Sequence, residues 1–326
     1  MEAALELERL NKSFGATRAI EDLDLVIPHG ATYGLIGPSG AGKTTAIRMI
    51  MSILFPDSGT LRVLGRASAL EAKDRIGYLP EERGVYRKMR VDAFLSYMGR
   101  LKGGARADVD TRARDLLTRL GLAEALKKKC EDLSKGMLQR VQFVAAIINR
   151  PELLILDEPF SGLDPVSVRL LKEMIAEEQR RGATIIFSTH VMSHAEELCQ
   201  QIVMIHKGCK VLDAPMAALR RQYDARTVVF EPLDRSADLM ALKAVHGVER
   251  VRLTDEGCDI ALAENTDPAA AMRALVAVIA PARIELARVR LEDVFIRLVT
   301  SEGATNESQA ALRKELQDLD VEGATA

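Results

Sequence analysis

Hydrophobic and polar residues near the N-terminus alternate over short stretches, which is the period of strands with one buried face. Two such stretches, at residues 5–7 and 26–27, predict antiparallel strands that are broken at 11–15. Residues 153–156 are apolar without interruption, and this predicts a buried strand of a parallel sheet. Further strands are expected at 33–36, 60–64, 76–79 and 184–187, with a hairpin at 202–205 and 210–212.

The period changes to that of helices over residues 91–149. We expect this segment to be a helical insertion within an α/β domain. Ser134 precedes one helix and Asp164 precedes another, and both residue types cap helix N-termini. The helices expected in this part of the chain are 91–101, 109–120, 134–149, 165–181 and 196–200.

After residue 223 the pattern describes a second, smaller unit. Its order is strand, helix, two strands, helix and strand, which predicts a ferredoxin-like sandwich. We therefore expect a large domain over 1–222 with a helical subdomain at about 88–150, an accessory domain over 223–300, and a polar tail over 301–326. In that tail Leu312, Leu316 and Leu319 form one thin apolar stripe, either a docking helix or a frayed one. The accessory elements expected are 227–230, 237–245, 248–253, 258–262, 268–279 and 283–289, followed by a helix at 292–299.

A glycine-rich loop with the pattern G-x-x-x-x-G-K-[ST] lies between the strand at 33–36 and a segment with helical spacing. Its glycines let successive backbone N–H groups turn toward a polyphosphate, and the following helix adds positive partial charge. Lys43 can reach the β- and γ-phosphates, and the Thr44 hydroxyl can hold Mg²⁺. The alternative is a βα turn that binds nothing. The loop comprises Gly37, Pro38, Ser39, Gly40, Ala41, Gly42, Lys43, Thr44 and Thr45.

Two carboxylates, Asp157 and Glu158, follow the buried strand at 153–156. Ligands bind at the carboxyl ends of strands in open α/β sheets. Asp157 is therefore placed to hold Mg²⁺ through water, opposite Thr44, and Glu158 to orient or deprotonate the water that attacks the γ-phosphate. A pair of merely solvated strand-end carboxylates is the alternative, and the phosphate loop upstream argues against it.

A second helix N-terminus suited to phosphate begins at Ser134, where Gly136 allows a close approach of backbone. One chain does not need two such sites for a single γ-phosphate. A second copy of the chain could supply this one across an interface.

Together these motifs resemble the nucleotide-binding subunit of an ABC transporter. The matching segments are 37–45 (Walker A), 133–137 (signature), 153–158 (Walker B), 161–164 (D-loop) and His190 (switch histidine). The resemblance implies an ATPase of the P-loop NTPase fold, a RecA-like mixed sheet with an antiparallel β subdomain and a helical insertion. It further implies ATP and Mg²⁺, a dimer that encloses two ATP molecules, and a separate membrane permease. Phe14 would stack on adenine, His190 would sense the γ-phosphate, and Asp164 and Lys135 would lie beside the nucleotide.

The chain departs from the family pattern in two motifs. Glu81 stands where the family usually has glutamine; a carboxylate can ligate Mg²⁺ but cannot donate the amide hydrogen bond. In the signature, Lys135 replaces a glycine and Met137 replaces a glutamine, whereas Ser134 and Gly136 are retained. The Glu81 and Lys135 variants and the C-terminal segment are similar to bacterial ABC-2-type exporter ATPases related to sodium-efflux and drug-resistance ATPases. In that reading the permease contacts the chain near the Glu81 loop.

Composition mainly excludes other classes. A net charge of −2 over 326 residues gives no sign of attraction to nucleic acid. The four cysteines are far apart, so neither a zinc site nor a disulfide framework is indicated. Because residues 1–6 are acidic and lack an apolar core, we expect no signal peptide there, and no stretch approaches the ~20 apolar residues that cross a bilayer. We expect a cytoplasmic protein that lies on the inner face of the membrane through its permease.

Two other functions share the phosphate loop. A soluble ABC-type switch acting on DNA or ribosomes is the main alternative, but no long coiled coil fits between Glu81 and Ser134, and the chain holds one ATPase unit. A P-loop kinase or GTPase is disfavoured by the signature and by the Asp157–Glu158 pair. The accessory domain either contributes dimer contacts or regulation, or braces the ATPase core.

Overall fold

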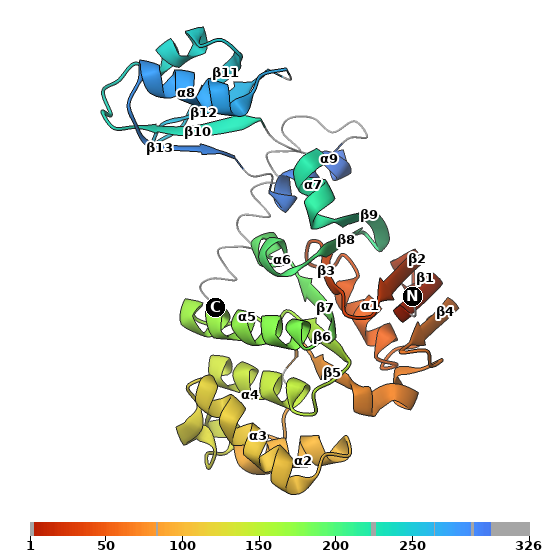
Figure 1. Cartoon of the computed structure of the whole chain (residues 1–326). Helices are drawn as coiled ribbons and strands as arrows, with labels where there is room; N and C mark the ends of the chain where they lie inside the picture. The colour runs from red at the N-terminus through yellow and green to blue at the C-terminus, as the bar shows by residue number, and fades with distance from the viewer. Residues whose placement is uncertain (1–2, 83, 223–225, 264, 288–289, 301–326) are drawn as a thin grey trace. The chain divides into compact units, whose positions relative to one another are not determined.

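The computed structural model describes residues 3–82, 84–222, 226–263, 265–287 and 290–300. By their contacts these residues form two compact units (Figure 1). The first contains the chain up to Met216 together with the helix α9 (Leu291–Thr300), and the second contains Ala217–Arg290. From the sequence we expected residues 291–300 to belong to the accessory domain, but α9 groups with the first unit. The apolar stripe expected in the tail lies outside the described residues.

The first unit is built on a six-stranded sheet with the order β5-β6-β7-β3-β8-β9. Its first five members in that order pair in parallel, and β9 is antiparallel to β8. The helix α1 (Lys43–Ile50) covers one face, and α4, α5 and α6 cover the other (Figure 1). The strands are β3 (Thr32–Ile36), β5 (Ile76–Leu79), β6 (Leu153–Asp157), β7 (Thr184–Thr189), β8 (Gln201–His206) and β9 (Cys209–Pro215).

A three-stranded antiparallel sheet of order β2-β1-β4 packs on the α1 side. Its strands are β1 (Ala3–Phe14), β2 (Thr17–Pro28) and β4 (Ser58–Val63). The break expected at 11–15 is wrong, because β1 continues to Phe14 and the turn forms at Gly15, whose φ is +59°. Side-chain contacts hold Asn11 and Lys12 in the strand: Asn11 donates a hydrogen bond to Asp22, and Lys12 forms an ion pair with Asp57 at 2.6 Å.

The helical segment agrees closely with the pattern of the sequence. The predicted helix at 91–101 is confirmed, and the Ser134 hydroxyl caps α4 by accepting from the Met137 N–H at 3.3 Å. The 3₁₀ turn η1 (Ala69–Arg75) and the helix α7 (Met216–Gln222) were not predicted. The other helices are α2 (Val91–Leu101), α3 (Arg106–Arg119), α4 (Lys135–Ile147), α5 (Pro165–Arg180) and α6 (Met192–Leu198).

The second unit is an antiparallel sheet of order β11-β12-β10-β13 with helical segments packed on it, which confirms the ferredoxin-like prediction. Phe230, Ile260 and Leu275 are fully buried in its core. The α-helix expected at 237–245 is wrong: this connection is the 3₁₀ helix η4 (Leu239–Ala244). The remaining elements are β10 (Thr227–Pro232), β11 (Val248–Leu253), β12 (Cys258–Leu262), α8 (Pro268–Val278) and β13 (Pro281–Leu286).

Within the described residues, no helix combines the length and the apolarity needed to cross a membrane.

Candidate active site

The glycine-rich loop connects β3 to α1 and is shaped by close backbone contacts. Gly37 has a φ of +150°, and a Cβ there would lie 2.1 Å from the Ile205 carbonyl oxygen. The Gly208 N–H, in the turn after β8, donates to the Ala41 carbonyl at 2.9 Å. The neighbouring strand and turn therefore set the path of the loop, and glycine is required where the two backbones meet.

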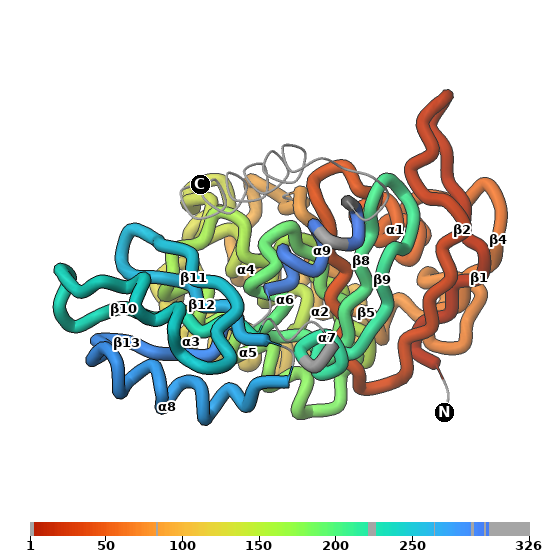
Figure 2. The backbone as a smooth tube through the Cα atoms, turned by 90° about the horizontal axis from the view of Figure 1, so that it is seen from above, coloured from red at the N-terminus to blue at the C-terminus, as the bar shows by residue number. Residues whose placement is uncertain are grey.

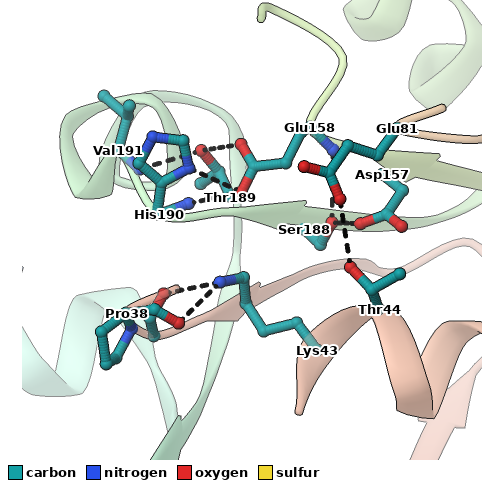
Figure 3. A network of polar contacts seen from close by, with 11 residues as sticks. Pro38, Lys43, Thr44, Glu81, Asp157, Glu158, Ser188, Thr189, His190 and Val191 are labelled. Atoms are coloured by element: carbon teal, nitrogen blue, oxygen red, sulfur yellow. Dashed lines mark hydrogen bonds and ion pairs between the residues drawn. The ribbon is translucent and has the colours of Figure 1, made fainter. Parts of the chain in front are cut away.

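Lys43 begins α1 and turns its side chain back over the loop (Figure 3). Its Nζ donates to the carbonyl oxygens of Gly37 at 2.7 Å and Pro38 at 3.1 Å, and the residue is only 6% exposed. Burial lowers the pKa of Lys43, and the nearby carboxylates of Glu158, Asp157 and Glu81 oppose that shift. Phosphate oxygens of a nucleotide could accept hydrogen bonds from the Lys43 ammonium group in place of these two carbonyl oxygens.

Asp157 ends β6 in a fully buried position, where one of its carboxylate oxygens accepts from the Ser188 hydroxyl. The other, Oδ2, is buried without a hydrogen-bond partner among the described residues. Burial raises the pKa of Asp157, while the Ser188 hydrogen bond opposes the shift. Nearby, the Thr44 hydroxyl lies 3.4 Å from Glu81 Oε2. A buried acceptor left unpaired costs free energy unless something binds it, and oxygen donors of this kind suit a hard cation.

Glu158 follows directly, in a backbone conformation that holds its carboxylate against the end of β7. Its φ is +47°, which is uncommon for a residue with a side chain. Glu158 Oε1 accepts from the His190 backbone N–H at 2.9 Å and lies 2.8 Å from His190 Nδ1, and Oε2 accepts from the Thr189 hydroxyl at 3.3 Å (Figure 3). The strained backbone is thus offset by several hydrogen bonds, a pattern that clusters at functional sites.

The structure therefore brings together part of the residue set expected from sequence. Lys43, Thr44, Glu81 and the Asp157–Glu158 pair gather at the carboxyl ends of β3, β5 and β6, and His190 joins them from the end of β7 (Figure 3). Ser188 and Thr189 also take part, and sequence reasoning did not single them out. They could have been found from the sequence, because they are hydroxyl residues at the C-terminal end of the strand that follows the Walker B strand.

The N-terminus of α4 lies apart from this network. Among the described residues, no hydrogen bond or ion pair joins Ser134, Lys135 or Gly136 to the phosphate loop. It approaches the D-loop instead, since a Cβ on Gly136 would lie 3.1 Å from the Gly162 carbonyl oxygen. Asp164 caps α5, accepting from the Ser167 N–H at 3.0 Å and the Ser167 hydroxyl at 2.6 Å; these bonds lower the pKa of Asp164.

Phe14 lies at the tip of the β1–β2 hairpin and is 52% exposed. Lys12 Nζ lies 5.7 Å from the centre of its ring. The ring therefore has a free face of the kind that stacks on an aromatic base.

Comparison with known proteins agrees with this geometry. The family model described as ABC transporter matches residues 20–161. The uncharacterized ABC transporter ATP-binding protein YhaQ of Bacillus subtilis is 38% identical over 295 residues, which cover 90% of this chain and 98% of YhaQ. The chain belongs to the family of ABC transporter ATP-binding proteins.

Further matches bear on the fold and the subgroup of this ABC ATPase subunit. A solved ATP-binding subunit of an ABC transporter aligns at a TM-score of 0.63 with 31% identity, covering 68% of this chain and 93% of that one. It confirms the P-loop NTPase fold. The Nod factor export ATP-binding protein I of Paraburkholderia xenovorans is 35% identical and covers 67% of this chain and 73% of its own length. This relative is consistent with the exporter subgroup predicted from the motifs.

Proposed function

We propose that two copies of this ATPase subunit close around two ATP molecules and thereby drive a separate exporter permease. The observation that supports it most is the network in which Glu158 is held by His190 and Thr189, across from Lys43. A carboxylate fixed at the end of β6 faces the loop that would hold the γ-phosphate (Figure 3).

Lys43 and the loop would bind the triphosphate. The Lys43 ammonium would exchange the carbonyl oxygens of Gly37 and Pro38 for phosphate oxygens, and the loop N–H groups would add further donors. Ser39, Gly40, Ala41, Gly42 and Thr45 belong to the same cradle. At the other end of the nucleotide, the exposed ring of Phe14 would stack on adenine.

Thr44, Asp157 and Glu81 fit a Mg²⁺ ion, because the unpaired Oδ2 of Asp157 and the hydroxyl and carboxylate beside it are all oxygen donors. The ion would neutralise charge on the β- and γ-phosphates. Glu81 contributes a charged ligand at a position where the family usually has a neutral amide.

Glu158 would act as the general base that orients the attacking water. His190 and Thr189 fix both oxygens of its carboxylate and so orient the base. His190 would contact the γ-phosphate as well and change partners when that phosphate leaves.

The helix N-terminus at Ser134 would complete the site from the partner copy. In this chain no hydrogen bond or ion pair among the described residues joins it to the phosphate loop, and Ser134 is exposed while Gly136 is half-buried. Lys135, also exposed, would add positive charge near the partner's γ-phosphate. Asp164, beside this N-terminus, would lie at the same interface.

The permease would contact the subunit near Glu81. A cavity of about 300 Å³ opens beside this loop, lined by both apolar and polar groups. Its lining includes Tyr78, Pro80, Phe94 and Met98. The apolar face of an amphipathic helix can dock in a groove with such apolar residues. Such a contact would place the subunit in the cytoplasm, peripheral on the inner face of the membrane.

Similarity to the Nod factor export ATP-binding protein I supports export as the direction of transport.

The domain limits proposed are an ATPase domain over 1–222 with its helical subdomain at about 88–150, and an accessory domain over 223–300. The two compact units support a division into two domains, but they divide the chain at 216/217 and group α9 with the ATPase unit.

The test is a Glu158→Gln variant assayed for phosphate release. The amide keeps the shape of the side chain but loses the basic carboxylate, so we expect turnover to fall about 10²- to 10⁴-fold, the usual contribution of a general base. ATP binding should persist, and a Lys43→Ala variant that loses binding is the matched control. Undiminished turnover in Glu158→Gln would remove Glu158 as the catalytic residue.

A further inference from the structure

The helix α9 lies against two elements that hold the candidate site, although it is about a hundred residues away in sequence. The chain leaves the first unit after Met216 and returns to it at Leu291. Figure 2 shows α9 lying over α6, next to β8. One face of the helix is buried: Leu291, Val294, Phe295 and Ile296 are between 0% and 3% exposed.

The first contact is with α6, the helix that begins two residues after His190. The Leu291 backbone N–H donates to Glu196 Oε1 at 2.5 Å. Glu196 belongs to α6, whose own residues Met192 and Ala195 are buried against the sheet. A movement of α6 would therefore move His190, whose N–H and Nδ1 contact Glu158.

The second contact is with β8, the strand beside the phosphate loop. The Phe295 ring meets the His206 ring edge to face, with centroids 5.6 Å apart and planes at 71°. His206 ends β8, and the residue before it places its carbonyl oxygen against Gly37. The turn that follows bonds Ala41 through the Gly208 N–H. Phe295 thus packs against the end of β8, which contacts the phosphate loop at Gly37 and Ala41.

We infer that α9 is a positioning helix for ATP hydrolysis, in which Leu291 and Phe295 hold the His190 segment and the phosphate loop in register. This rests on the proposed roles of Glu158 and His190. Each end of the helix's buried face contacts a different wall of the site. Displacing α9 would let α6 and the end of β8 shift independently, and the catalytic carboxylate would lose its alignment with the γ-phosphate.

Phe295→Ala in the full chain tests this inference, with Phe295→Leu as the conservative variant. Below the melting temperature we expect Phe295→Ala to lower kcat about tenfold with a smaller change in KM, since small misplacements of reacting groups have effects of this order. The side-chain ¹⁵N resonances of His190, assigned with a His190→Gln variant, should shift because its contact to Glu158 loosens. Phe295→Leu should restore most of kcat. Val278→Ala, at an exposed apolar position of α8, should change neither readout.

Glu196→Ala, which removes the acceptor of the Leu291 N–H, tests the other contact and decides the matter if Phe295→Ala does not fold. It should also lower kcat and shift the His190 resonances. Folded variants at both positions with unchanged kcat and unchanged His190 resonances would overturn the inference. That outcome differs from failure of the proposed function, which would appear as turnover by Glu158→Gln.

Discussion

At the residue scale, the buried carboxylate of Asp157 carries a free-energy cost for folding. Its side chain is fully buried, and Oδ2 has no hydrogen-bond partner among the described residues. Burial raises the pKa of Asp157 above its ordinary value. For a carboxyl with a raised folded pKa, the neutral form favours folding, and this stability is lost as the pH rises through the folded pKa. At neutral pH the carboxylate therefore opposes folding while remaining ready for a cation.

Asp157→Asn should separate these two roles. In the nucleotide-free protein we expect it to raise the free energy of unfolding at neutral pH by about 1 kcal/mol, because the neutral amide avoids the cost of burying a charge and a shift of one pKa unit corresponds to about 1.4 kcal/mol. The gain should vanish at low pH, where Asp157 is itself protonated. Mg²⁺-dependent ATPase activity should be lost. Thermal unfolding at both pH values measures the first effect and phosphate release the second.

Asp164→Asn is the matched control, because hydrogen bonds from Ser167 lower the pKa of Asp164. Its carboxylate contributes stability above the unfolded pKa, and that stability is lost as the pH falls through the folded pKa. The control should therefore give no gain at neutral pH. An Asp157→Asn protein less stable than the wild type at neutral pH would contradict the account.

At the element scale, the β3–α1 loop depends on glycine in two different ways. A Cβ at Gly37 would lie 2.1 Å from a backbone oxygen, whereas a Cβ at Gly40 would meet nothing within 4 Å. Gly40 needs glycine only for its φ of +76°.

Gly37→Ala should therefore abolish ATP binding, because the backbone of β8 cannot move aside without breaking its pairing with β3. Gly40→Ala should lower stability by about 1 kcal/mol, the usual cost of a left-handed residue with a side chain, and should retain measurable ATP affinity. Equilibrium titration with a fluorescent ATP analogue compares the two variants. Equal affinities for both would show that close packing does not set the path of the loop.

Elements with strong periodicity or capping were predictable from sequence, and the others were decided by tertiary contacts. The helix at 91–101 and the cap at Ser134 follow local rules that the fold does not override. The strand through Asn11 was not predicted because its polar side chains are typical of a turn. Two cross-strand hydrogen bonds hold it extended: the Asn11 amide donates to the Asp22 carboxylate, and the Asp22 backbone N–H donates to Asn11 Oδ1. The connection at 239–244 tightened to a 3₁₀ helix that the apolar pattern does not distinguish from an α-helix.

The candidate site was predictable to a similar degree. Lys43, Thr44, Asp157 and Glu158 are marked by motifs whose spacing fixes their place at strand ends. The contact of Ser188 with Asp157 and the packing of α9 on α6 were not predictable. Both join residues that are distant in sequence and come together only in the folded chain. No local pattern encodes either one.

At the scale of the whole molecule, the single chain carries the parts of a site without closing one. The phosphate loop and Glu158 lie together, while the helix N-terminus at Ser134 has no bond to that loop among the described residues. A second copy, turned head to tail, would bring the missing part. Under the proposed function, dimerisation follows ATP binding and dissociation follows hydrolysis.

The most direct measurement is the solution mass of the Glu158→Gln protein by light scattering during size exclusion, with and without Mg²⁺ and ATP. The account predicts one chain per particle without nucleotide and two chains with ATP, since binding is retained and hydrolysis is blocked. Adding Ser134→Arg, which obstructs the partner's phosphate site, should return the particle to one chain. A Glu158→Gln protein that binds ATP and remains a single chain would contradict the claim that the site is shared between two copies.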